Sequence, residues 1–458
     1  MANSSSESAA ANIVVVGIGG DVGMYALCRS FHEAFGAPAV VLSTVATRAM
    51  QRSSFVENVV VPGLSDDETL ITELERQAAR FPSATRVLLT NSDWHIHTVV
   101  EHRERLEGAG YFLRYPSKDV LDRVCTKEGF AEICDRLGIP TPRTLALEIH
   151  TLTGPDSAAR ISSAVADAED LTYPVIAKPS DSSQWFEVSF PGKRKIHTLS
   201  TATELSELLG HLVEAAYPGA LLVQEYIPGD ETMQRSMTAY RSTAGEVTLL
   251  STGRVLLEEH TPGTLGIPAA IVVEPYEDAM ESAEKFLHES QYVGFGNFDF
   301  KYDSRTGEHV FFEMNPRIGR NNYYVTAAGV NVAEVLLADT AEARQGGEGG
   351  RAGAVGDEKA WQGGEGGRAG VVADGGGLAQ QRALNEVLYT VIPFSLLTRY
   401  ITDPELLARL KSLKKRKAVV NPLYYSGDAS PVRRFITWMI TYRYRSKYAK
   451  FYPQPLDG

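Results

Sequence analysis

Acidic and amide side chains gather in the segment NFDFKYDSRTGEHVFFEMNPRIGR, residues 297–320. Polar and apolar residues alternate on both sides of a turn-forming stretch at 303–307, which predicts a two-stranded hairpin. Because strand side chains point alternately to opposite faces, Asp299 shares a polar face with Glu313 and Asn315, and the aromatic residues face a core. Two carboxylates and an amide oxygen suit Mg²⁺, with phosphate oxygens supplying the other ligands.

Two arginines, Arg317 and Arg320, follow the predicted hairpin directly. A guanidinium group can bind phosphate or carboxylate oxygens through two parallel hydrogen bonds. A hairpin whose polar residues simply face water would explain the alternation. It would not explain two acids and an amide followed by two arginines, so we predict a site for a phosphorylated ligand.

Two lysines and a polar hinge extend this prediction. Lys178 ends the apolar strand YPVIAK, where a charge needs a partner, and Lys127 opens a predicted helix. Either could be a solvated surface lysine, but together with the hairpin they suit a triphosphate. The segment QEYIPGDE at 224–231 reads as a strand that ends in a proline-broken hinge, which could offer backbone groups to adenine and an acid to ribose.

Strands and helices alternate through the first hundred residues. This order predicts a doubly wound parallel sheet, which we place in a first domain at 1–120. The glycine-rich turn GIGGDVG at 17–23 lies where a dinucleotide fingerprint would lie, but Val22 occupies the third glycine position. A tight turn from strand to helix explains these glycines equally well, so the signal for NAD is weak.

The rest of the chain divides by composition. We predict a second α/β domain at 121–341, a disordered glycine-rich insertion at 342–377 and a basic, aromatic C-terminal region at 378–458. Within the insertion, QGGEGGRAG occurs at 345–353 and again at 362–370. Glycine this dense cannot offset the entropic cost of ordering the chain. The repeat is either a flexible tether or a neutral expansion in a surface loop.

The composition excludes several classes of protein. The 458 residues are 43% hydrophobic and 22% charged, with a formal charge of −12, which is ordinary for a globular protein and unfavourable for nucleic acid. Three cysteines without CxxC spacing argue against a disulfide scaffold. The first residues lack the features of a signal peptide, and no apolar run reaches the length of a membrane span. We therefore expect a cytoplasmic protein.

The C-terminal region departs from this acidic balance. From Arg399 onward there are 13 basic and four acidic residues, a net charge of +9, which leaves −21 on the rest of the chain. The stretch at 431–452 places aromatic residues at helical spacing among bases. It could contact the inner face of a membrane, dock a large anionic substrate, or pack on its own domain.

The order IAKPS, LVQEYIPGDE and FDF…FEMNPR resembles the ATP-grasp superfamily. GFGNFDFKYD with EMNPRIGRNNYY is similar to its carboxylate–amine ligases, which include the D-aspartate ligases of peptidoglycan crossbridge synthesis. The resemblance covers about residues 12–340. It implies an α/β ATP-grasp fold preceded by a Rossmann-like parallel-sheet domain, with ATP and Mg²⁺ as cofactors and Mn²⁺ as an alternative metal.

The resemblance also assigns roles by position. It implies metal ligation by Asp299, Glu313 and Asn315. It implies nucleotide contacts by Lys127, Lys178, Ser182, Ser183, Glu225, Tyr226, Ile227 and Glu231, with Asp230 as an alternative to Glu231 at the ribose. Lys178 and Arg317 would stabilise the transferring phosphoryl group, and Arg254 and Arg320 would bind the substrate carboxylate. Two departures stand out: Thr126 replaces the acid that many relatives have before the first lysine, and the loop at 181–195 lacks a glycine-rich pattern.

The implied activity is ATP-dependent amide formation through an acyl phosphate, which releases ADP. The expected substrates are an amino acid such as D-aspartate and an amine, such as the side-chain amine of a cell-wall precursor. One alternative is an ATP-grasp ligase that makes a free dipeptide or small amide. The other is a non-catalytic nucleotide-binding or NAD-binding protein. The sequence does not predict an oligomeric state.

Overall fold

The computed structural model describes residues 12–180, 182–194, 196–346, 370–372 and 380–453. The chain forms two compact units. The first unit contains residues 1–138, 230–300 and 313–458, and the second contains 139–229 and 301–312. The chain therefore passes from one unit to the other four times. The predicted domain boundaries at 120 and 341 do not coincide with these crossings.

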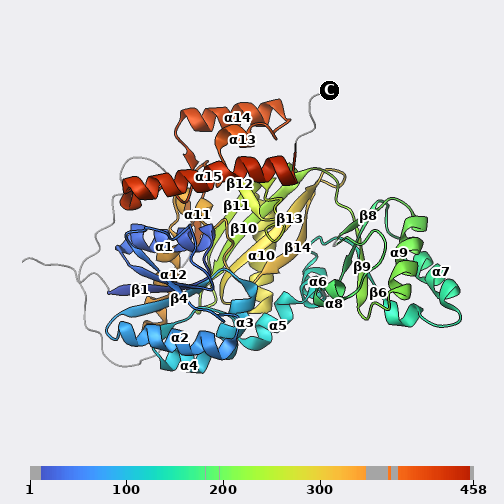
Figure 1. Ribbon diagram of the computed structural model, residues 1–458, viewed down its shortest axis with the longest axis horizontal. Coiled ribbons are helices and arrows are strands. Elements are labelled where there is room, and N and C mark those ends of the chain that lie inside the picture. Colours follow the sequence, from blue (N-terminus) through green and yellow to red (C-terminus); the bar gives the residue numbers. More distant parts are fainter. Residues whose placement is uncertain (1–11, 181, 195, 347–369, 373–379, 454–458) are drawn as a thin grey trace, which may run out of the picture. The chain divides into compact units, whose positions relative to one another are not determined.

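The first unit opens with a five-stranded parallel sheet in the order β3-β2-β1-β4-β5. Its strands are β1 (Ile13–Ile18), β2 (Ala39–Ser43), β3 (Val56–Val60), β4 (Thr85–Thr90) and β5 (Tyr111–Phe112). Every residue of β1 is buried, as expected for an apolar strand with helices on both faces. The helices of this region are α1 (Val22–Phe35), α2 (Asp67–Arg80), α3 (Asp93–Glu101), α4 (Arg103–Gly108), α5 (Lys118–Cys125) and α6 (Lys127–Leu137). The predicted parallel sheet is confirmed (Figure 1).

A larger sheet follows in the order β14-β13-β10-β11-β12-β17-β18, with β15 and β16 joined to it through β11. Its strands are β10 (Gln234–Arg241), β11 (Val247–Glu258), β12 (Pro268–Val273), β13 (Gly294–Asp303), β14 (Glu308–Asn315), β15 (Gly370–Val372), β16 (Gln380–Arg382), β17 (Leu388–Thr390) and β18 (Val419–Val420). The ends of β13 and β14 that meet at their turn belong to the second unit. The remaining elements of the first unit are η2 (Glu231–Met233), α10 (Glu277–Ser290), α11 (Tyr323–Ala327), α12 (Val332–Gly346), α13 (Phe394–Leu397), α14 (Pro404–Lys415), η3 (Ser426–Asp428) and α15 (Pro431–Phe451).

The glycine-rich segment lies mostly outside the described residues. α12 continues to Gly346, and residues 370–372 form β15, which pairs antiparallel with β16. The prediction of disorder at 342–377 otherwise falls on residues that the structure does not describe, and it stays a prediction.

The second unit is built around a four-stranded antiparallel sheet in the order β6-β9-β7-β8. Its elements are β6 (Thr144–Glu148), η1 (Ile149–Leu152), α7 (Ser157–Asp167), β7 (Val175–Pro179), α8 (Ser182–Glu187), β8 (His197–Leu199), α9 (Ala202–Glu214) and β9 (Ala220–Glu225). The leucines of α9 recur on one face and pack against this sheet in a separate core, as the sequence spacing predicts.

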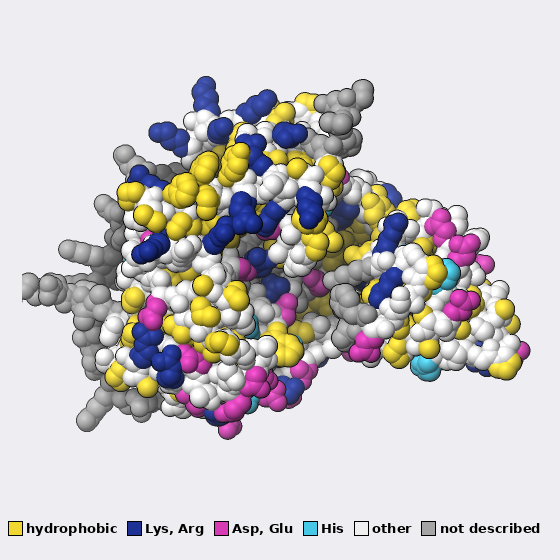
Figure 2. All heavy atoms as spheres, in the orientation of Figure 1, with side chains coloured by type: hydrophobic (Ala, Val, Ile, Leu, Met, Phe, Trp, Pro, Cys, Tyr) yellow, Lys and Arg dark blue, Asp and Glu magenta, His cyan; other side chains and the backbone are white. Residues whose placement is uncertain are grey.

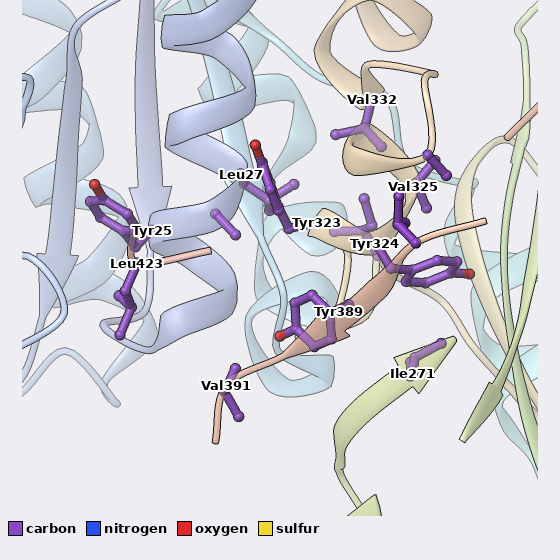
Figure 3. Close-up of a cluster of buried hydrophobic side chains, with 14 of the residues drawn as sticks. Tyr25, Leu27, Ile271, Tyr323, Tyr324, Val325, Val332, Tyr389, Val391 and Leu423 are labelled. Carbon is purple, nitrogen blue, oxygen red and sulfur yellow. The ribbon is translucent and has the colours of Figure 1, made fainter. Parts of the chain in front are cut away.

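One apolar core joins the parallel sheet of the first unit to the larger sheet. Side chains from α1 meet side chains from α11, β12 and β17 in this cluster (Figure 3). The residues labelled there are Tyr25, Leu27, Ile271, Tyr323, Tyr324, Val325, Val332, Tyr389, Val391 and Leu423. The parallel-sheet region therefore shares its interior with the sheet that carries the predicted metal ligands.

A buried charge, that of Arg433, fixes the C-terminal helix α15 to α1. Arg433 is fully buried, its Nε lies 3.2 Å from Asp428 Oδ2, and its guanidinium lies over the ring of Tyr25. Burial alone would raise the pKa of Asp428, but hydrogen bonds from Ser54 and Tyr25 and the charge of Arg433 outweigh it and lower the pKa. α15 is therefore part of the folded body. Among the described residues, no helix is long and apolar enough to cross a membrane.

Replacing Asp428 with alanine should lower the free energy of unfolding by about 3–5 kcal/mol, because the buried Arg433 loses its carboxylate. Denaturation in urea at neutral pH measures this. The exposed Glu405 provides the control, since Glu405→Ala should change stability by less than about 0.5 kcal/mol.

The same ion pair sets a pH dependence. A carboxyl whose pKa is lowered by folding stabilises the protein above its unfolded pKa of about 4, and this contribution is lost as the pH falls through the folded value. The difference between wild type and Asp428→Ala should therefore shrink in acid. A difference that stays constant down to the pH of acid unfolding would contradict this role.

Candidate functional site

The hairpin of β13 and β14 has the predicted alternation. Phe298 and Phe300 are fully buried and Met314 is nearly so, with Phe298 packed edge-on against Phe286 of α10. On the opposite face, the Asn315 amide donates a hydrogen bond of 3.0 Å to Asp299 Oδ2. The structure therefore brings these two predicted ligands into contact, with Glu313 on the same face of β14.

The electrostatics of this face suit a cation. Burial, followed by the negative charge of Glu313, raises the pKa of Asp299 to about 7. Asp299 accepts a second hydrogen bond from Asn297, at 3.3 Å, and the charge of Glu258 also acts on it. Asn297 stands at period-two spacing from Asp299, so the sequence pattern is consistent with its place on this face, whereas Glu258 on the distant strand β11 gave no local signal. A divalent cation would relieve the repulsion between these carboxylates.

The donor set is incomplete without a ligand. Within the described ranges, no three His, Cys, Asp or Glu side chains are grouped as metal ligands. The predicted set has two carboxylates and one amide, which is typical of Mg²⁺ that is also held by phosphate oxygens. The Asn315 oxygen already accepts a hydrogen bond of 3.0 Å from Arg317. Because a carbonyl oxygen has two lone pairs, this contact leaves one for a metal.

Acids from the parallel sheet hold both arginines that follow the hairpin. Arg317 Nε lies 2.9 Å from Asp93 Oδ1, at the start of α3. Arg320 forms an ion pair with Asp21, which caps the N-terminus of α1 by accepting a hydrogen bond from the backbone of Met24. The arginines were predicted from the sequence, but their acidic partners were not. Those partners lie more than 200 residues earlier, so only the tertiary fold reveals them.

The turn between β1 and α1 explains its glycines. Gly19 has a φ of +121°, which other residues rarely adopt. A Cβ on Gly23 would lie 2.6 Å from the backbone of Arg320, so α1 packs directly on the loop after the hairpin. The carboxylate of Asp21 occupies the helix N-terminus, where a dinucleotide would place its pyrophosphate. This arrangement disfavours NAD at the turn.

A crevice of about 750 Å³ opens at the carboxyl ends of the parallel strands, next to this ion pair. It is lined by Gly19, Gly20, Asp21, Ser43, Thr44, Val45, Thr47, Leu64, Ser65, Trp94 and His95. Burial lowers the pKa of His95, so this side chain is neutral at physiological pH. Asp21 links the crevice to Arg320, which lies five residues after Asn315. Trp94 in the crevice lining follows Asp93, and Arg317, the partner of Asp93, donates a hydrogen bond to Asn315, so the crevice is linked to a predicted metal ligand within the first unit.

Two further predicted residues of the first unit are engaged with protein groups. Arg254 donates a hydrogen bond of 2.8 Å to the carbonyl of Thr232. Glu231, the predicted ribose ligand, lies 2.6 Å from His260 Nε2 and accepts a 2.7 Å hydrogen bond from the backbone N–H of Glu258. The alternative, Asp230, accepts hydrogen bonds from the backbone and hydroxyl of Thr232 and so caps η2.

The predicted adenine hinge lies in the second unit and is organised by a lysine. Lys301 donates hydrogen bonds to the carbonyls of Ile227, at 2.9 Å, and Gly229, at 2.7 Å, and it lies 5.4 Å from the ring centre of Tyr226. Lys301 was not among the residues predicted from the sequence. Its period-two spacing from Asp299 was the available signal, whereas its partners depend on the tertiary fold.

The other predicted nucleotide contacts of the second unit are partly described. Lys178 Nζ donates to Gln224 Oε1 at 3.0 Å, which gives this strand-end charge a partner. Glu225 lies on the neighbouring strand β9, 3.7 Å from Arg143. Ser182 and Ser183 begin α8, and their side chains lie outside the described part of the chain.

Lys127 is exposed at the first position of α6, in the first unit. The preceding Thr126 caps this helix by accepting a hydrogen bond of 3.1 Å from the backbone of Gly129. The departure from the acid of many relatives therefore has a structural role. The structure places the predicted nucleotide residues in both units, and their contacts with a nucleotide stay predictions.

Comparison with known proteins identifies the family of this chain. Residues 141–338 match the family model described as the carbamoyl-phosphate synthase L chain, ATP binding domain. The chain is 30% identical over 326 residues to a D-aspartate ligase of Enterococcus faecium (strain Aus0004), which covers 70% of this chain and 75% of that protein. The chain belongs to the ATP-grasp family of carboxylate–amine ligases.

Other relatives are more distant from the present chain. This chain is 24% identical over 225 residues to the C-terminal section of the carbamoyl phosphate synthase large chain of Methanopyrus kandleri, and the match covers 47% of this chain and 37% of that protein. Among solved structures, an L-amino acid ligase from Bacillus licheniformis aligns with a TM-score of 0.47 at 13% identity, over 71% of the ligase and 73% of that chain. A similarity at this level adds nothing to the assignment.

The family assignment confirms the predicted ATP-grasp fold, the Rossmann-like parallel sheet that precedes it and the carbon–nitrogen ligase class. The ligase is therefore an ATP-binding enzyme. The alternative of a non-catalytic or NAD-binding protein loses its support.

Replacing Asp299 with asparagine should abolish Mg²⁺-dependent release of ADP, because it removes one of the two charges that would hold the cation. The metal-free variant should melt at the same temperature as wild type or higher, since the substitution removes a carboxylate that is buried beside Glu313. Calorimetry and an ADP assay measure the two effects.

Glu308→Gln is the matched control, because Glu308 is exposed on the same strand as Glu313 and has no predicted role. It should retain activity. Near-normal activity of Asp299→Asn would refute the metal assignment.

Proposed function

We propose that this ligase activates a carboxylate of D-aspartate and joins it to an amine of a cell-wall precursor, as part of peptidoglycan synthesis. The observation that carries the proposal is the 30% identity to a D-aspartate ligase over three quarters of that protein's length. The polar face of β13 and β14, with two arginines directly after it, supports the chemistry.

The reaction has two balanced steps. A carboxylate oxygen of aspartate attacks the γ-phosphorus of ATP, which forms an acyl phosphate and releases ADP. The amine nitrogen then attacks the acyl carbon, the carbon–oxygen bond to phosphate breaks, and the nitrogen loses a proton. The products are an amide and inorganic phosphate. Both steps build negative charge, so the protein contributes mainly positioning and neutralisation.

Each group of residues has a proposed part in these steps. Asp299, Glu313 and Asn315 would hold Mg²⁺, or Mn²⁺ in its place, and the metal would neutralise phosphate charge. Lys178 and Arg317 would stabilise the transferring phosphoryl group. No protein nucleophile is needed, because the acyl phosphate already activates the carboxylate. Burial also raises the pKa of Cys125 and of Cys134 to about 12, which disfavours their thiolates as nucleophiles.

The crevice beside Asp21 is the proposed entrance for the acceptor. Its volume of about 750 Å³ suits a ligand larger than a free amino acid, and its hydroxyl groups suit a polar one. The imidazole of His95, which lines this crevice, is the proposed acceptor of the proton that the amine loses. Contact of the C-terminal region with a membrane stays a separate prediction and is not needed for this activity.

The substrate proposal is tested by ADP release with purified enzyme, MgATP and single amino acids, with hydroxylamine as a small acceptor that traps acyl phosphates. We expect a hydroxamate from D-aspartate and at least about tenfold less from L-aspartate or D-asparagine, since each changes a group that the site must bind. If free amino acids served as amine acceptors as fast as a precursor peptide does, the result would favour the alternative of a ligase that makes free dipeptides.

Arg320→Lys should raise the KM for the amino acid by about tenfold or more while the KM for ATP changes little, because lysine cannot bind a carboxylate through two parallel hydrogen bonds. Steady-state kinetics with each substrate varied in turn measure this. Arg136→Lys, on the exposed face of α6, is the control. An equal rise in both constants would contradict the assignment of Arg320 to the carboxylate.

A further inference from the structure

α15 carries an apolar stripe on its outer face. Val432, Phe435, Trp438 and Tyr442 follow helical spacing and are 56%, 58%, 51% and 54% exposed. We call these four residues the aromatic stripe. Surface helices normally turn such a row toward the protein interior, so an exposed one indicates an interaction surface.

The inner face of α15 is held by other residues. Tyr444 donates a hydrogen bond to the buried Glu259, Tyr448 donates to the backbone carbonyl of Glu258, and Arg433 pairs with Asp428. α15 is therefore fixed to the body of the first unit without the aromatic stripe. The stretch 431–452 thus packs on its own domain, as one of the alternatives predicted, but it does so through residues other than the exposed Phe435, Trp438 and Tyr442.

The stripe is a preformed surface. The ring centres of Phe435 and Trp438 lie 6.0 Å apart, and those of Trp438 and Tyr442 lie 5.2 Å apart, in stacked arrangements. Grooves of about 350 and 380 Å³ include Trp438 in their walls. One is also lined by Phe394 and Tyr424. Apolar chains or rings of a partner could enter both grooves.

Basic side chains surround the stripe. Arg434, Arg443 and Arg445 lie on α15, and α14 exposes Lys411, Lys414 and Lys415. Figure 2 shows hydrophobic and basic side chains gathered over α13, α14 and α15. Few acids balance them, and the nearby Asp428 is already paired with Arg433.

We propose that the aromatic stripe and the surrounding bases bind the surface of an anionic lipid bilayer, with α15 lying parallel to the membrane plane. Aromatic rings at the level of the headgroups and bases facing anionic lipids are the two features of interfacial helices. A second copy of the chain would bring two strongly basic faces together, and these would repel each other. A long nucleic acid would extend beyond the basic face and be repelled by the rest of the protein, whose net charge is −21 by sequence. A flat bilayer contacts the basic face alone. This proposal is independent of the substrate.

Flotation of the full-length ligase with vesicles tests the proposal. Vesicles of phosphatidylglycerol and phosphatidylcholine in equal amounts should bind at least about tenfold more protein than vesicles of phosphatidylcholine alone, and high salt should remove this preference. The triple variant Phe435→Ser, Trp438→Ser, Tyr442→Ser should lower binding by about tenfold or more. Val60→Ser, at a 44% exposed apolar residue of β3, should bind as wild type does.

The triple variant also needs a test of folding. It should keep its melting temperature and its ADP release in a vesicle-free assay, because none of the three residues belongs to the proposed ligase site. Equal binding of wild type to both kinds of vesicle, no binding to either, or unchanged binding of the triple variant would overturn the proposal. If wild type and Val60→Ser sedimented as dimers and the triple variant as a monomer, the stripe would be assigned to contact with a second copy of the chain instead.

Discussion

Two carboxylates on one strand pair, Asp299 and Glu313, repel each other on a face that is partly shielded from water. Burial, and after it the charge of Glu313, disfavours ionised Asp299 in the absence of a cation and raises its pKa. The hairpin can place both acids there because its opposite face is anchored in a core by Phe298, Phe300 and Met314. The stability of that aromatic face thus supports a polar face that is poised to bind a positive charge.

The arginines after the hairpin extend this electrostatic arrangement into the parallel sheet. Asp93 and Asp21 come from the carboxyl ends of β4 and β1, and each holds one guanidinium in place. Gly23 lets α1 approach the backbone of Arg320, so the helix and the loop after β14 meet with no side chain of residue 23 between them. The parallel-sheet region accordingly supplies the acidic partners of both predicted site arginines.

Much of this arrangement could be predicted from the sequence because it depends on local spacing. The alternation from Asn297 to Asn315 defines which side chains share a face, and the apolar run of β1 marks a strand that is buried on both sides. The acidic partners of the arginines could not be predicted, since pairs such as Asp93 and Arg317 are 224 residues apart. For the same reason, the engagement of Glu231 with His260 was not foreseen. The two compact units were missed because the second is assembled from separate stretches of chain.

That assembly affects how the protein is made. The carbonyls of Ile227 and Gly229 are bound by Lys301, which is translated 74 and 72 residues later. As the chain leaves the ribosome, the antiparallel sheet of the second unit can form well before the lysine that completes its hinge has emerged. The hinge therefore stays incomplete until the hairpin is synthesised, so the nascent chain would complete the predicted adenine hinge and acquire the predicted metal ligands at nearly the same time.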